Sequence, residues 1–159
     1  TQELDASRGV HIREQKALLD KIRTDFEAMS IAVNEAEALR RQLRDLMPLL
    51  TGDMLTDVQA LDETVTAIEN QMLQIKHTGK GQDTIRLPGM IMEKLAYLAS
   101  TVAIADFKPA DQYIDVYAKL SAEWAEVKAA WEQVKGGDVV RLREKMIASG
   151  VAPLILAES

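Results

Sequence analysis

The chain has 159 residues and a net charge of −6, and apolar residues make up 47% of it while aromatic residues make up 4%. This length and composition predict one domain, residues 1–159, and exclude a disordered chain. The charges form no basic stripe, which argues against a nucleic-acid partner, and the absence of cysteine excludes disulfides and thiolate chemistry. No apolar run approaches the roughly 20 residues that a membrane-spanning helix needs.

The first predicted helix covers about residues 3–48. Its apolar residues recur at steps of three and four in a heptad-like stripe, which only Gln15 and Arg40 interrupt with polar side chains. Ser30 is the weakest point, where a kink could form, and Pro48 ends the pattern. An unbroken helix of this length would reach about 68 Å. Its N-terminal half therefore needs cover from the fifth helix, the C-terminal tail, a partner, or the rest of a larger protein.

Four shorter helices are predicted to follow, at about residues 53–77, 88–105, 109–135 and 139–149. Pro88 and Pro109 suit the first helical position, and the short link between their helices requires an antiparallel pair. Gly136-Gly137 is predicted to end the fourth helix, and Asp138 to cap the fifth. Gly150 is expected to adopt the left-handed conformation that ends many helices. The predicted fold class is an all-α, antiparallel up-down bundle of four main helices with a very long first helix and a short fifth helix.

Catalytic and metal sites are not indicated by any motif in the chain. His11 and His77 lack the Glu-x-x-His spacing with which helical bundles hold paired metals, so no metal or other cofactor is expected. Lys80 lies between two glycines, unlike the lysine of a P-loop, so this segment is predicted to be a solvated loop. The serines lie in no nucleophile-elbow pattern. The segment is therefore predicted to be non-catalytic.

The aromatic residues of the fourth predicted helix are the main candidates for an interface. Trp124 and Trp131 lie seven residues apart on one face and are the only tryptophans. One interpretation is a core stripe that packs on the helix beginning at Pro88. The other is that one of them, with Tyr113 or Tyr117, is an exposed anchor for a partner, because such residues dominate interface hot spots. A further candidate interface residue, which could also bridge helix ends, is Arg86.

Several segments of the chain carry a family resemblance: Arg86-Leu87-Pro88, residues 94–98 (KLAYL), Asp106 with Pro109, Tyr117 with Leu120, residues 38–43 (ALRRQL) and residues 150–153 (GVAP). In these segments the chain resembles the C-terminal helical region of bacterial sortilin-like proteins with BNR-type propeller repeats, which are often labelled predicted glycosyl hydrolases. The resemblance implies a domain that follows a β-propeller, with any glycosidase carboxylates upstream. It also implies an extracytoplasmic or secreted location.

The function predicted for this segment is a non-catalytic helical interaction or scaffold domain from a larger, bacterial protein. Because the chain begins at Thr1 rather than at a methionine, we expect it to be an excised domain. Its expected partner is the propeller of the parent chain or another protein surface. The alternative is a self-associating coiled-coil or sensor-type bundle, with a homodimer formed through the first helix.

Overall fold

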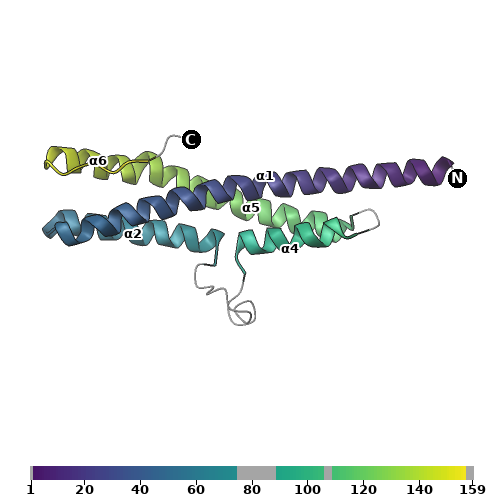
Figure 1. Ribbon diagram of the computed structural model, residues 1–159, viewed down its shortest axis with the longest axis horizontal. Helices are drawn as coiled ribbons and strands as arrows, with labels where there is room; N and C mark the ends of the chain where they lie inside the picture. The colour runs from purple at the N-terminus through teal and green to yellow at the C-terminus, as the bar shows by residue number, and fades with distance from the viewer. Residues whose placement is uncertain (1, 75–88, 106–108, 157–159) are drawn as a thin grey trace.

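The computed structural model describes residues 2–74, 89–105 and 109–156 (Figure 1). Within these residues every regular element is a helix. The elements are α1 (Gln2–Leu46), the 3₁₀ turn η1 (Met47–Leu49), α2 (Gly52–Met72), α4 (Ile91–Ala103), α5 (Asp111–Gln133), the π-helical turn η2 (Val134–Asp138) and α6 (Val139–Ala148). The predicted all-α bundle, with a long first helix and a short last one, is confirmed.

Helix α1 is continuous over 45 residues, and α2, α4 and α5 pack along it, whereas α6 packs on α2 (Figure 1). The Ser30 hydroxyl donates a hydrogen bond of 2.9 Å to the Phe26 carbonyl one turn earlier, and the helix runs through this point without a break. The apolar stripe predicted from the sequence faces the core over most of its length. The buried residues of α1 are Leu18, Ile22, Met29, Ala32, Val33, Ala36, Leu39 and Leu43.

The shorter helices lie along α1 in an order that differs in part from up-down alternation. Helix α2 runs antiparallel to α1, and α4 then continues in the same direction as α2 instead of reversing (Figure 1). Helix α5 returns antiparallel to α4, as the short link between them predicted (Figure 1). Helices α2 and α4 therefore share the length of α1 between them, and α5 packs on both.

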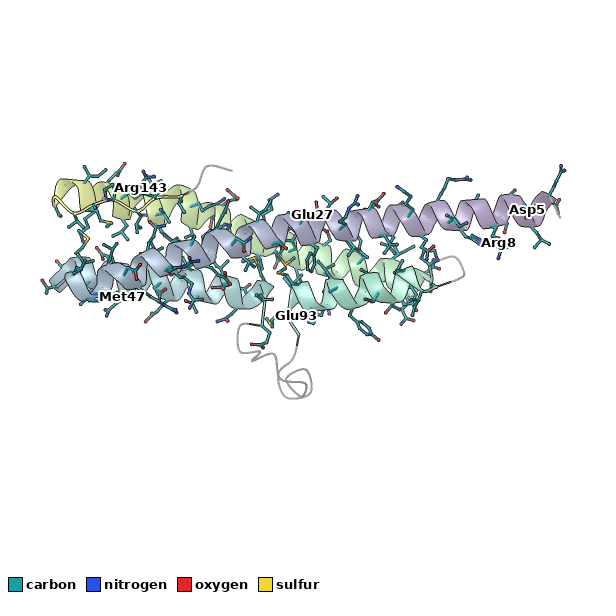
Figure 2. All side chains as sticks on the ribbon, in the orientation of Figure 1. Asp5, Arg8, Glu27, Met47, Glu93 and Arg143 are labelled. Carbon is teal, nitrogen blue, oxygen red and sulfur yellow. The ribbon has the colours of Figure 1, made fainter. Side chains whose placement is uncertain are left out.

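The carboxylate of Glu93 joins the end of α2 to the start of α4 (Figure 2). Its Oε1 accepts the Gln74 N–H at 2.8 Å, and its Oε2 accepts the Met90 N–H at 2.9 Å. A carboxylate in the first turn of a helix satisfies N–H groups that have no intrahelical partner and interacts favourably with the helix dipole. One side chain thus fixes where α4 begins relative to α2.

The two helix starts predicted at prolines differ from the observed ones. Helix α4 begins at Ile91 after the N-cap residue Met90, and Pro88 lies outside the described residues. Helix α5 begins at Asp111, and its N-cap is Ala110, which has an extended backbone. Pro109 therefore precedes the cap instead of occupying the first helical position, so that prediction is wrong.

The predicted stop at Gly136-Gly137 is also wrong. Helix α5 passes through η2 into α6 without a break, and neither glycine has a positive φ angle. Asp138 has helical backbone angles and no capping hydrogen bond, and its carboxylate pairs instead with Arg141. Two glycines weaken a helix by about 1 kcal/mol each relative to alanine. Buried side chains on both sides of the pair outweigh that preference; they are Trp131, Val134, Val139 and Leu142.

Gly150 ends α6 as predicted, with a φ angle of 73°. Its N–H donates to the Ile147 carbonyl at 3.1 Å, and the Val151 N–H donates to the Met146 carbonyl at 2.9 Å. These two bonds are those of a Schellman motif, which requires a left-handed residue. The turn reverses the chain, and the following residues run back toward the middle of the bundle (Figure 1).

The N-terminal turns of α1 extend beyond the ends of α4 and α5 (Figure 1). Asp5 and Arg8 lie on this projecting part (Figure 2), and residues 2–8 are all exposed. Two of the four predicted candidates for covering this region are the fifth predicted helix, which is α6, and the C-terminal tail, residues 151–156. Both lie at the opposite end of the bundle (Figure 1), so neither covers it.

Candidate interaction surface and polar centres

Gln15 interrupts the apolar stripe of α1 where α4 ends. Its side-chain amide donates hydrogen bonds to the Val102 carbonyl at 2.6 Å and to the Ala105 carbonyl at 3.0 Å. The last carbonyls of a helix lack intrahelical partners, so these bonds complete the C-terminus of α4. Gln15 therefore determines the position of α4 along α1, and its role is structural.

Arg40, the second interruption of the stripe, forms a buried ionic network between α1 and α2. Its guanidinium pairs with the carboxylate of Glu69, and its Nε lies 3.6 Å from Asp62 Oδ1. Glu69 is 1% exposed and is the buried charged residue of the described chain. Because a buried carboxylate requires a cation or several hydrogen bonds, Arg40 explains how Glu69 is accommodated in the core.

The two tryptophans are buried, as the core-stripe interpretation requires. Trp124 is 4% exposed and Trp131 is 1% exposed. The Trp131 indole N–H donates to Glu35 Oε2 at 2.9 Å, and Lys135 Nζ lies 3.0 Å from the same oxygen. Lys135 also lies 5.8 Å from the centre of the Trp131 ring, within cation–π range. In this structure neither indole is available to a partner.

Tyr117 also contacts α1 through its polar group. Its hydroxyl donates a hydrogen bond of 2.7 Å to Asp25 Oδ2, and its side chain is half-buried against the core. Burial and the hydrogen bond to Asp25 both raise the pKa of the Tyr117 hydroxyl above its ordinary value. This contact makes Tyr117 a structural residue of the α1–α5 interface.

The alkaline pH dependence of stability follows from this raised pKa. Folding favours the protonated phenol, so its stabilising contribution is complete below about pH 10, the ordinary pKa of tyrosine, and is lost as pH rises through the folded-state pKa. Replacing Tyr117 by phenylalanine should lower the free energy of unfolding by about 1 kcal/mol at pH 8. The difference between the two proteins should shrink above pH 10. Urea titrations from pH 8 to 11 test this, and a constant difference would contradict it.

A groove of about 690 Å³ lies between α4 and α5. Its lining includes Leu98 and Leu120, which are buried, and Tyr113, which is partly buried. Tyr97 and Val116 also line it and are 76% and 42% exposed. Of the five predicted interface residues, Tyr113 lies in this groove, whereas Arg86 lies outside the described residues.

Tyr97 is a candidate residue that the sequence interpretation missed. It lies between Leu95 and Leu98 of the predicted stripe of α4, and the structure places it on the exposed side of that helix. An aromatic residue that falls off the apolar stripe of an amphipathic helix was the signal that could have identified it.

A second, more polar hollow of about 410 Å³ lies between α2 and α6. Lys145 of α6 forms an ion pair with Asp57 of α2 there, and this hydrogen bond raises the pKa of the lysine. Both side chains are more than 40% exposed, at 46% and 45%. Exposed pairs contribute little to stability, so this contact is a minor connection between the two helices.

No metal or membrane feature is found in the part of the chain that the structure describes. Residues 2–74, 89–105 and 109–156 contain no group of three or more His, Asp or Glu arranged to hold a metal ion. The described helices include none that is long and apolar enough to cross a bilayer. His77 and Lys80 lie outside these residues. Comparisons of the chain with protein-family models, with curated proteins and with solved structures found no match.

Proposed function

We propose that this chain is a non-catalytic helical scaffold domain that docks another protein surface in the groove between α4 and α5. The observation that carries the proposal is that the exposed Tyr97 and the partly buried Tyr113 both line that groove. Tyrosine adds a large contact area with little loss of side-chain freedom, and it is enriched at interface hot spots. The buried Leu98 and Leu120 make the groove apolar below these rings.

The charges around the groove support a protein partner. Lys94, Lys119 and Glu123 line it, so both signs are present. Glu93 also lines it, but its carboxylate accepts the N–H groups of Gln74 and Met90. An apolar centre with a charged edge of mixed sign is the usual anatomy of a protein interface.

The structure supports a scaffold role through the fixed positions of its helices. Gln15 completes the end of α4, Glu93 its beginning, and Arg40 ties α1 to α2. A surface built on helices held in this way keeps its shape when a partner binds, which reduces the entropy lost on binding. By the family resemblance, the docked surface would be the propeller of a longer protein.

Site-specific photo-cross-linking tests the proposed surface. A photoreactive phenylalanine analogue replaces Tyr97 in one variant and Ile147, which is 62% exposed on α6, in the matched control. Both variants are expressed in the cells that naturally produce this protein. We expect a defined cross-linked product from position 97 and none from position 147. Equal products at both positions, or none at position 97, would refute docking in the groove.

Self-association through the first helix is the second candidate function. Leu4 and Ile12, in the N-terminal part of α1, are 71% and 59% exposed. Light scattering after gel filtration gives the solution mass. A monomer over a wide concentration range would favour the scaffold function. A dimer that persists on dilution, and that dissociates when Leu4 and Ile12 are both replaced by lysine, would favour self-association.

A further inference from the structure

The C-terminal residues 151–156, here called the tail, follow α6 in an extended course with no helical or strand structure. After the turn at Gly150, the tail returns to α1, where Gln42 holds it. From Pro153 to Leu156 its side chains alternate between exposed and buried. Leu154 is 1% exposed and belongs to the core, Ile155 is 73% exposed, and Leu156 is partly buried. An extended peptide with one face on a surface shows this period of two.

The Gln42 side chain recognises the backbone of the tail instead of its side chains. Gln42 Nε2 donates to the Ile155 carbonyl at 2.7 Å, and the Ile155 N–H donates to Gln42 Oε1 at 2.9 Å. The amide therefore forms the two bonds that a neighbouring β-strand would form with that residue. Such recognition accepts any non-proline residue at position 155, because proline alone lacks the N–H.

The Leu154 side chain supplies the selective contact. It is buried among the core residues, whereas Ala152, Pro153 and Ile155 around it are exposed. One apolar anchor between exposed neighbours, with the backbone paired beside it, is how many protein surfaces bind extended peptides. The tail thus has the features of a peptide ligand that is covalently attached to its own site.

We propose that the surface of α1 around Gln42, together with the pocket that holds Leu154, is a binding site for an extended peptide with a leucine anchor, and that the tail is its resident ligand. The tail binds this site reversibly, and it dissociates from the site while the helical bundle stays folded. Its tether keeps the local concentration of the ligand high, so a free peptide competes poorly until the anchor is weakened.

Binding of a labelled peptide to the full chain tests the proposal. The probe is a fluorescent peptide with the sequence of residues 149–159, SGVAPLILAES. We expect it to bind the Leu154→Ala protein about tenfold or more tightly than the wild type, because the resident tail no longer competes. A probe in which alanine replaces the leucine at the position of Leu154 should bind neither protein. Replacing Gln42 by alanine in the Leu154→Ala protein should weaken binding again.

The matched control is Ile155→Ala, which changes an exposed side chain of the same tail and leaves the backbone pairing intact. It should bind the probe as poorly as the wild type. If a folded Leu154→Ala protein, checked by circular dichroism, binds no probe, or if the Leu154→Ala and Ile155→Ala proteins bind it equally, the proposal is refuted.

Hydrogen exchange of the wild type gives a second test that needs no variant to fold. The Ile155 amide, which is bonded to Gln42, should exchange much faster than the amides of the buried middle of α1, because the tail leaves its site on its own. Exchange of the Ile155 amide only at the rate of global unfolding would show that the tail is an inseparable part of the core, and would overturn the proposal.

Discussion

Replacing Trp131 by alanine is expected to lower the free energy of unfolding by about 3–5 kcal/mol. Trp131 is 1% exposed, so its removal leaves a large cavity in the core. The substitution also removes the indole N–H that donates to Glu35, which then keeps Lys135 as its partner. Urea denaturation followed by circular dichroism measures the change.

Two companion variants separate burial from hydrogen bonding at this position. Trp131→Phe keeps most of the ring but removes the N–H, so we expect a smaller loss, of about 1–2 kcal/mol. Tyr97→Ala removes a ring that is 76% exposed and should change stability by about 0.5 kcal/mol or less. If Trp131→Ala proves no more destabilising than Tyr97→Ala, then Trp131 is an exposed anchor and the core assignment is wrong.

The apolar periodicity of the chain predicted the fold class well, because helix period and core burial have the same physical cause. Residues at steps of three and four share one face, and that face of α1 is buried from Leu18 to Leu43. The same pattern placed Ile12 on the stripe, yet Ile12 is 59% exposed. Periodicity shows which face is apolar, but it does not show how far the neighbouring helices extend.

Local stop signals failed where packing on both sides was stronger. Gly136-Gly137 and Asp138 together predict a helix end and a new cap. The chain instead continues through a π-helical turn, which adds a residue to one turn of the helix. Gly150 has no comparable buried helix beyond it, and there the local signal predicted the structure correctly.

The candidate surface was harder to predict than the fold. The sequence identified Trp124, Trp131, Tyr113 and Tyr117 as aromatic residues of one helix face, but the tryptophans are buried and the tyrosines partly buried. Among the described aromatic residues, the exposed one is Tyr97, on another helix. Whether an aromatic residue is covered depends on contacts between helices that are distant in sequence. Gln42 shows the same limit, because its partner Ile155 lies 113 residues away.

The ionic network of Arg40 leads to the second large prediction. Arg40→Met should lower the free energy of unfolding by about 3–5 kcal/mol, because it leaves the Glu69 carboxylate buried without a cation. The control is Arg23→Met on the same helix, which removes a guanidinium that is 68% exposed and pairs with Asp20. That change should lower stability by about 1 kcal/mol or less. Thermal and urea unfolding of the three proteins provide the comparison.

The double variant Arg40→Met/Glu69→Met distinguishes a stabilising ion pair from a positional constraint. Replacing a buried pair by apolar residues of similar volume is often neutral or stabilising, so the double variant should recover most of the stability lost in Arg40→Met. Asp62 is 18% exposed as a side chain, but its Oδ1 is buried without a hydrogen bond, so the loss of Arg40 should leave a residual cost in both variants. A double variant as unstable as the single one would show that the pair itself stabilises the fold. Full recovery would show that the pair contributes little net stability, and that its role is to fix the register of α2 on α1, since only one alignment brings Glu69 to Arg40.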